Sequence, residues 1–178
     1  TQDKLPFTEG MNPNPISPYA LHKIIAEQYC SLFSNLWGLN TICLRYFNVY
    51  GPGMNPDGAY ANLLPKFIKL MSNGKTPTIY GDGKQSRDFT YISDVVEANM
   101  LAAKSNLTNE IINIGRGKNV SVNNVVTILN KLLSKDIKPI HGPTLIEPKN
   151  TLASHKKATQ LLGWRPKVNF EEGLKTMI

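Results

Sequence analysis

The chain has 178 residues, about the length of one domain and enough to bury a hydrophobic core. Hydrophobic residues make up 41% and charged residues 19%, which is typical of a globular protein and excludes a disordered one. No apolar run approaches the roughly 20 residues that span a bilayer, and no signal peptide is visible. Cys30 and Cys43 lack metal-ligand spacing and are expected to be reduced, buried thiols. We therefore expect a cytoplasmic protein with no metal and no membrane partner.

The formal net charge is +7, from 20 Lys and Arg against 13 Asp and Glu. This excess suits a protein whose ligand carries phosphates, and it also permits nucleic-acid binding. The lysines are scattered, however, and the arginines are only Arg45, Arg87, Arg116 and Arg165. Nucleic acid is therefore the weaker alternative, and no nucleic-acid partner is expected.

The first expected helix follows a loop over residues 1–16 that is punctuated by proline and glycine. Ser17 is a good N-cap residue, and Pro18 suits the first helical position, where its missing N–H has no cost. Apolar residues then recur at helical spacing, and Gly38 is a typical stop. The pattern predicts a helix over residues 18–37.

Strands and helices alternate through the rest of the chain. Residues 40–47 form a short apolar, β-branched run that predicts a buried strand, and a loop rich in glycine and proline follows it. The further expected elements are a helix over 60–73, strands over 78–80 and 87–92, a helix capped by Ser93 and ending at 104, strands over 110–114 and 120–122, a helix over 123–134, a strand over 137–140, and helices over 155–162 and 170–177. This alternation predicts an α/β fold.

Tyr19 and Lys23 stand four residues apart, so they share one face of the first expected helix. A fixed ammonium beside a phenol favours the phenolate, which makes a general acid/base that can take a proton from an alcohol. The same spacing recurs at Tyr80 and Lys84, but the glycines between them predict a turn without a shared face. The spacing alone is also compatible with an ordinary surface pair.

Five motifs occur in a fixed order and together resemble a known family. They are Leu-Pro-Phe-Thr-Glu at 5–9, Pro-Ile-Ser-Pro-Tyr-Ala-x-x-Lys-x-x-x-Glu at 15–27, Leu-Arg-Tyr-Phe-Asn-Val-Tyr-Gly-Pro at 44–52, Tyr-Gly-Asp-Gly-x-x-Ser-Arg-Asp-Phe-x-Tyr-Ile-x-Asp-Val at 80–95 and Leu-Leu-Gly-Trp-x-Pro at 161–166. This series resembles the extended short-chain dehydrogenase/reductase family that acts on nucleotide sugars, particularly its UDP-glucose 4-epimerase-like members.

The resemblance implies a fold and a division of the chain. The expected fold is the C-terminal part of a Rossmann-type doubly wound parallel sheet plus a small α/β substrate-binding domain. Residues 1–58 would complete the NAD-binding domain, and residues 59–178 would mainly bind the nucleotide sugar, with some segments returning to the sheet. The glycine-rich dinucleotide fingerprint is absent, because Gly115-Arg-Gly117 lacks a third glycine and is interpreted as a turn. We therefore expect a C-terminal portion with an open sheet edge near residues 40–47.

The resemblance also implies roles for individual residues. Tyr19 would be the acid/base and Lys23 its partner, and both would contact NAD together with Tyr46 and Phe47, although plain core packing explains the last two equally well. The expected contacts to a UDP-sugar or dTDP-sugar are Asn48, Asn62, Leu63, Thr78, Ile79, Tyr80, Arg87 and Glu147. Arg87 is the phosphate candidate because guanidinium binds phosphate oxygens bidentately, with a structural ion pair to Asp88 as the alternative.

Three functions remain open at this point. The leading one is NAD-dependent epimerisation at carbon 4 of a UDP-hexose through a transient keto sugar. A nucleotide-sugar 4,6-dehydratase is the rival within the same family. A non-catalytic nucleotide-sugar-binding or dimerisation module is the alternative of another class. The isolated chain is expected to bind UDP weakly, to bind NAD hardly at all and to be inactive. A homodimer through the 17–38 helix is expected for the parent enzyme.

Overall fold

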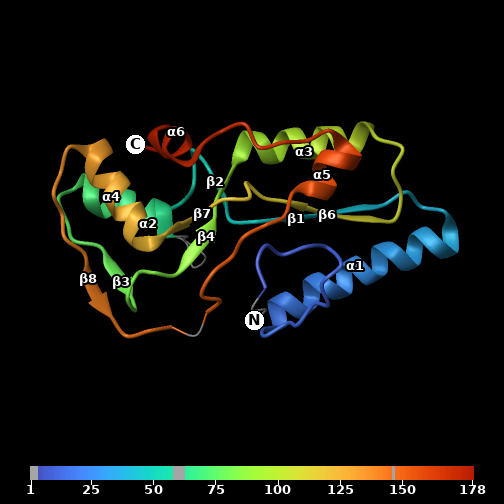
Figure 1. The fold of residues 1–178 in the computed structure, drawn as a ribbon, viewed down its shortest axis with the longest axis horizontal. Coiled ribbons are helices and arrows are strands. Elements are labelled where there is room, and N and C mark those ends of the chain that lie inside the picture. Colours follow the sequence, from blue (N-terminus) through green and yellow to red (C-terminus); the bar gives the residue numbers. More distant parts are fainter. Residues whose placement is uncertain (1–3, 58–62, 146) are drawn as a thin grey trace.

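The computed structural model describes residues 4–57, 63–145 and 147–178. Its elements are, in chain order, α1 (Pro18–Trp37), β1 (Ile42–Tyr46), β2 (Val49–Tyr50), α2 (Leu63–Ser72), β3 (Thr78–Tyr80), β4 (Ser86–Asp88), β5 (Thr90–Tyr91), α3 (Ile92–Lys104), β6 (Glu110–Ile114), β7 (Asn119–Ser121), α4 (Val122–Leu133), β8 (Ile140–Gly142), α5 (Lys156–Leu162) and α6 (Phe170–Lys175). Figure 1 shows two groups of elements, with α2, α4, α6, β3 and β8 at one end and α1, α3, α5, β1 and β6 at the other. The fold is mixed α/β, as the sequence predicts.

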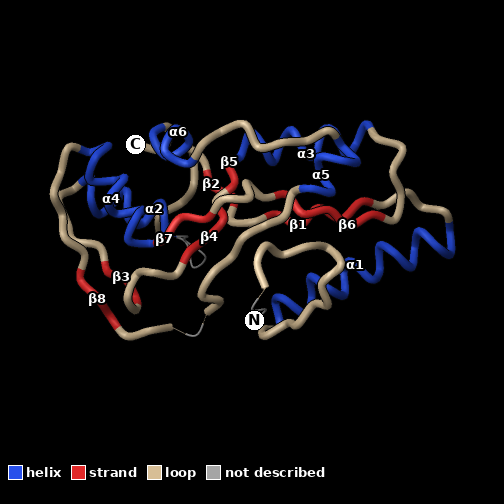
Figure 2. The backbone as a smooth tube through the Cα atoms, viewed as in Figure 1, coloured by secondary structure: helices blue, strands red, loops and turns tan. Residues whose placement is uncertain are grey.

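The strands of the described residues pair two by two. Strands β1 and β6 are parallel, from Ile42 opposite Glu110 to Tyr46 opposite Ile114. The pairs β2–β5 and β3–β8 are also parallel, whereas β4–β7 is antiparallel. In Figure 2 the β1–β6 pair lies between α1 on one side and α3 with α5 on the other. Within the described residues β1 pairs with β6 alone, so its other edge is open, as expected.

Local capping sets both ends of α1, as the sequence predicts. The Ser17 Oγ accepts the N–H of Ala20 at 3.2 Å, and Gly38 takes a left-handed conformation with φ of 65° while its N–H bonds to Ser34. Only a residue without a Cβ adopts this conformation at little cost, so the helix stops there. None of the residues in α1 is buried, and Trp37 near its end is 65% exposed. The helix therefore presents an uncovered apolar surface.

Several expected boundaries are wrong. The predicted strand over 87–92 is two strands, β4 and β5, which separate at Phe89 because they pair with different partners. Helix α3 begins at Ile92 with Tyr91 in the cap position, so Ser93 is not the cap. The strand expected over 137–140 starts only at Ile140, where pairing with β3 begins. The start of the helix expected over 60–73 lies outside the described residues.

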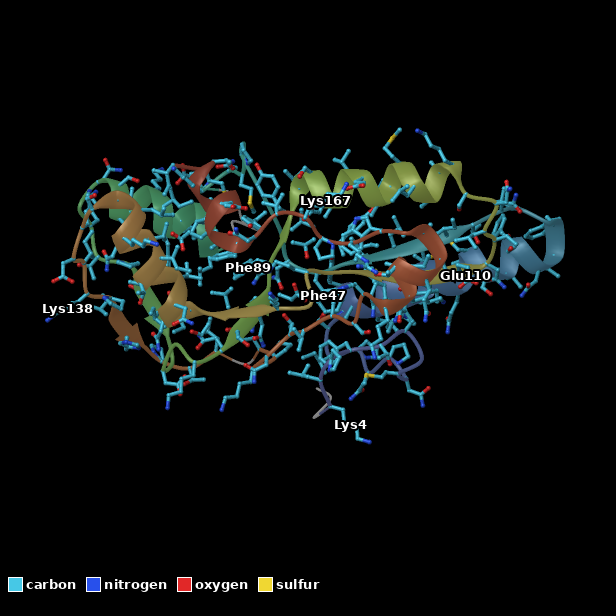
Figure 3. All side chains as sticks on the ribbon, turned by 45° about the horizontal axis from the view of Figure 1, so that its top comes forward. Lys4, Phe47, Phe89, Glu110, Lys138 and Lys167 are labelled. Atoms are coloured by element: carbon cyan, nitrogen blue, oxygen red, sulfur yellow. The ribbon has the colours of Figure 1, made fainter. Side chains whose placement is uncertain are left out.

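Two hydrophobic clusters hold the two ends of the molecule. The first joins α2, α4 and α6 around Tyr50, Phe89 and Phe170, whose rings are in mutual contact. The second packs α3 and α5 on β6, with Trp164 fully buried and its indole N–H donating to the Asp94 carbonyl at 2.8 Å. Figure 3 places Phe47 and Phe89 near the centre, where the two groups of elements meet. None of the described helices has the length and apolarity needed to cross a membrane.

The remaining sequence expectations concern burial. Strand β1 is half-buried along most of its length and not buried as predicted, because one of its edges has no neighbouring strand among the described residues. Cys30 and Cys43 are free, as expected, but half-buried. Burial and the neighbouring Cys30 thiol raise the pKa of Cys43 to about 11, so its thiol stays protonated at neutral pH.

Candidate active site

Tyr19 and Lys23 lie one turn apart near the start of α1. The Lys23 ammonium is 5.3 Å from the centre of the Tyr19 ring, and the tyrosine side chain is largely exposed. The helix start fixed by Ser17 and Pro18 therefore brings the two side chains to one face, as the spacing predicts. The arrangement supplies a phenol beside a cation, which is the chemical unit of a tyrosine acid/base.

A pocket of about 560 Å³ lies between β2, α2, β3 and β4. Seven of the eight expected substrate contacts line it, although they come from five separate segments; they are Asn48, Leu63, Thr78, Ile79, Tyr80, Arg87 and Glu147. The eighth, Asn62, lies outside the described residues. The structure therefore gathers residues separated by up to about a hundred positions into one concave surface, which is how ligand pockets are built.

Arg87 is the central charged group of this pocket. Its Nη2 forms an ion pair with Glu147 Oε2 at 2.6 Å, and its Nη1 donates to the carbonyls of Ser86 at 2.9 Å and Lys149 at 3.3 Å. The alternative partner considered from the sequence, Asp88, does not pair with it. Glu147 and Arg87 are thus in direct contact in the lining of the pocket.

Asp88 instead lies on the opposite side of β4 and is fully buried. Its Oδ1 accepts the Arg116 N–H at 2.9 Å, while its Oδ2 accepts those of Gly117 at 2.9 Å and Ala153 at 3.0 Å. Burial raises the pKa of Asp88, and the three backbone N–H groups oppose this shift. The carboxylate therefore clamps two loops directly behind Arg87.

Tyr46 is the last residue of β1 and Phe47 follows it directly, but their side chains point to different places. Phe47 lines a second pocket, of about 580 Å³, together with Ala20, which is the neighbour of Tyr19. Tyr46 instead donates its hydroxyl to the Asn99 side chain on α3 at 2.8 Å. Successive side chains on a strand face opposite sides, so only Phe47 is brought towards the start of α1.

Arg45 and Glu27 form a link that the sequence analysis missed. The guanidinium of Arg45 on β1 binds the Glu27 carboxylate on α1 through two bonds of 2.7 and 2.6 Å. These hydrogen bonds raise the pKa of Arg45 above its ordinary value. Arg45 also lines the second pocket, and Glu27 closes the Tyr-x-x-x-Lys-x-x-x-Glu motif. The motif named Glu27 but gave no signal for this partner, which lies 18 residues away in the sequence on a different element.

Comparison with known proteins places this geometry in a family. Residues 1–115 match the model of the NAD dependent epimerase/dehydratase family. A putative UDP-glucose 4-epimerase of Methanocaldococcus jannaschii is 39% identical over 175 residues, which are 98% of this chain and 56% of that protein. Human dTDP-D-glucose 4,6-dehydratase is 32% identical, over 97% of this chain and 50% of its own length.

Two solved structures show the same fold. UDP-N-acetylglucosamine 4-epimerase of Methanobrevibacter ruminantium, in complex with UDP-N-acetylmuramic acid, gives a TM-score of 0.94 at 36% identity, over 99% of this chain and 57% of that one. UDP-glucuronic acid 4-epimerase of Bacillus cereus, with UDP-glucuronic acid and NAD, gives 0.90 at 35% identity, over 99% and 56%. The chain spans about half the length of these proteins. By its motifs, its Rossmann-type α/β fold and its match over residues 1–115, the chain belongs to the NAD dependent epimerase/dehydratase family.

Proposed function

We propose that the protein containing this chain interconverts epimers at carbon 4 of a UDP-hexose, with NAD as cofactor. The observation that carries this proposal is that Asn48, Arg87 and Glu147 line one and the same pocket. Similar chains with solved structures bind UDP-sugars, and one of them also holds NAD. A glucose, an N-acetyl or an acid form of the sugar is compatible with the residues described.

Tyr19 is the acid/base in this proposal. It removes the proton of the sugar hydroxyl at carbon 4 and returns it after the transient keto sugar has turned over. Lys23 stabilises the phenolate through its ammonium, which lies over the same ring. NAD, when bound, accepts the hydride and gives it back.

The second pocket fits the nicotinamide end of that cofactor. Phe47 supplies an apolar wall, Asn113 a buried amide, and Ala20 places the pocket next to Tyr19. Its lining is largely apolar with a few polar groups, as is usual for cofactor sites. Phe47 therefore borders the cofactor in this proposal, whereas Tyr46 is engaged by α3.

The first pocket would hold the nucleotide. Arg87 binds the phosphates, since a guanidinium matches their oxygens bidentately. Glu147 accepts the ribose hydroxyls, Asn48 contacts the sugar, and Thr78–Tyr80 flank the base with Leu63 nearby. Isothermal titration with UDP tests this assignment, because Arg87→Gln should weaken binding by about tenfold or more. Equal UDP affinity of the variant and the wild type would remove Arg87 from the site.

Tyr19→Phe in the full-length protein tests the chemistry. The substitution removes the titrating oxygen and little volume, so the fold should persist while turnover falls by about two to four orders of magnitude. Tyr29→Phe is the matched control, because Tyr29 is an exposed tyrosine on the same helix. Epimerisation by Tyr19→Phe at nearly the wild-type rate would contradict the assignment.

A 4,6-dehydratase is the second candidate, supported by the human relative of that name. Product analysis separates the two. An epimerase returns a sugar of unchanged mass with inverted configuration at carbon 4, whereas a dehydratase releases a product lighter by one water.

The domain division, the assembly and the location complete the proposal. Residues 1–58 would belong to the cofactor domain and residues 59–178 mainly to the substrate domain, with β6 returning to the sheet beside β1. The exposed apolar residues of α1, among them Phe33 and Trp37 with ring centres 4.5 Å apart, support a homodimer through this helix. We place the protein in the cytoplasm. Light scattering that finds only monomers of the full-length protein at high concentration would exclude the dimer.

A further inference from the structure

Arg116 stands in the Gly115-Arg-Gly117 turn, which the proposed function does not use. The turn joins β6 to β7, and Gly117 takes a φ of 72°. The backbone N–H groups of Arg116 and Gly117 both bind the buried Asp88 carboxylate. The base of the Arg116 side chain is therefore held in a fixed position.

The guanidinium of Arg116 is only partly satisfied. Its carbon lies 5.8 Å from the centre of the Phe170 ring, and its Nη2 donates to the Lys118 carbonyl at 2.9 Å. Its Nε is buried and has no hydrogen-bond partner among the described residues. None of the ion pairs found among these residues includes Arg116. Burial lowers the pKa of Arg116, with the charge of Asp88 opposing the shift. A half-buried cation without a paired acceptor is unusual in a folded protein.

A pocket of about 360 Å³ adjoins this cation. Its lining includes Asn119, Asn124 and Asn169, whose side-chain amides can donate hydrogen bonds, and Thr127, whose hydroxyl donates to the Asn123 carbonyl at 3.2 Å. The pocket also contains Glu171, but Lys131 pairs with that carboxylate at 2.6 Å. Arg116 is thus the charge in the pocket lining that has no ion-pair partner among the described residues.

The pocket is separate from the proposed nucleotide pocket. Phe89 lines the nucleotide pocket and Phe170 lines this one, and the two rings stack with centres 5.0 Å apart. The aromatic cluster therefore forms a wall between them. A ligand beside Arg116 would contact neither Arg87 nor Glu147.

We propose that this Arg116 pocket is a second binding site, which takes a small molecule carrying an oxyanion, either a carboxylate or a phosphate. The planar guanidinium presents parallel N–H donors that match two oxygens of either group. The surrounding amides donate to the remaining oxygens or to hydroxyl groups of the same molecule. The pocket volume limits the ligand to a small metabolite.

Titration calorimetry of the protein containing this chain, with sodium phosphate and separately with sodium acetate at constant ionic strength, tests the proposal. At least one anion should bind saturably, and Arg116→Gln should weaken that binding by about tenfold or more. Arg165→Gln, at an exposed arginine, should leave it unchanged.

A second variant tests the pocket independently, in case Arg116→Gln fails to fold. Asn124→Ala alters the pocket without touching the contact between Arg116 and Phe170, and it should weaken the same anion several-fold. Binding of neither anion to the wild type, or equal binding to wild type and Arg116→Gln, would overturn the proposal. Because UDP takes no part in these titrations, their failure is distinct from failure of the proposed epimerase function.

Discussion

Replacing Asp88 tests the clamp behind Arg87 in two graded steps. Asp88→Ala leaves three buried backbone N–H groups without an acceptor, those of Arg116, Gly117 and Ala153. Each orphaned N–H costs about 1–3 kcal/mol, and removal of a buried charge offsets part of the sum. We expect a loss of about 4 kcal/mol in the free energy of unfolding, a large share of the 5–15 kcal/mol typical of a domain.

Asp88→Asn should cost far less, about 1 kcal/mol. The amide oxygen can occupy the Oδ2 position and keep two of the three bonds, while only the Arg116 N–H faces an amide nitrogen. The neutral amide also avoids the free-energy cost of burying a charge, which is what raises the pKa of the carboxyl.

The pH dependence of the same pair of proteins has a definite sign. The folded-state pKa of Asp88 lies above its ordinary value of 3.8, so the folded form binds this proton more tightly than the unfolded form. This contribution to the free energy of unfolding is fully present below pH 3.8 and is lost as the pH rises through the folded-state pKa. The difference in the free energy of unfolding between wild type and Asp88→Asn should therefore be larger at about pH 4 than at about pH 8.

Urea unfolding followed by the fluorescence of the buried Trp164 measures the free energy of unfolding of wild type, Asp88→Ala and Asp88→Asn at each pH. Asp136→Asn is the control, since Asp136 is exposed and should change stability by less than about 0.5 kcal/mol. Equal losses for the alanine and asparagine variants, or a gap that widens as the pH rises, would refute the clamp.

Three further predictions concern packing, thiol reactivity and the nucleotide pocket. Gly173→Ala should cost about 1–3 kcal/mol in urea unfolding, because the added Cβ would overlap the hydroxyl of the buried Tyr50, while Gly10→Ala, with open space around it, should be neutral. With both cysteines in place, Cys43, followed by mass spectrometry of its peptide, should react with iodoacetamide at pH 8 about a hundredfold more slowly than a thiol at the reference pKa of 9.0; rapid labelling of Cys43 contradicts this. Glu147→Gln should weaken UDP binding in calorimetry, because Glu147 accepts the ribose hydroxyls in the proposed function; tighter binding would show instead that the carboxylate competes with phosphate for Arg87.

Local signals predicted the elements whose ends depend on neighbouring residues. Helix α1 has the expected bounds because Ser17, Pro18 and Gly38 act within one turn of its ends. The strand over 110–114 was also predicted with its observed bounds, from a short apolar run between turns. The division at Phe89 was not predictable in this way, because β4 and β5 are set by pairing with segments far away in the chain.

The candidate site divides in the same way. Resemblance to the family named seven of the residues that line the nucleotide pocket, and three of these, Asn48, Tyr80 and Arg87, stand in the motifs themselves. They did not indicate that Glu147 pairs with Arg87, because that pairing depends on how a distant segment crosses β4. The sequence also did not indicate that the Arg116 Nε is buried without a hydrogen-bond partner. The contacts of that side chain depend on the fold and not on the two glycines beside it.

The parallel pairing of β1 with β6 has a consequence for synthesis on the ribosome. Strand β1 can pair with β6 only after β6 has been synthesised, about 70 residues later, which takes about 4–14 s at ordinary elongation rates. During that interval an apolar strand waits with both edges unpaired by the described residues that precede β6. A nascent chain that ends before β6 therefore exposes a strand that invites association, and the arrival of β6 covers one of its two edges.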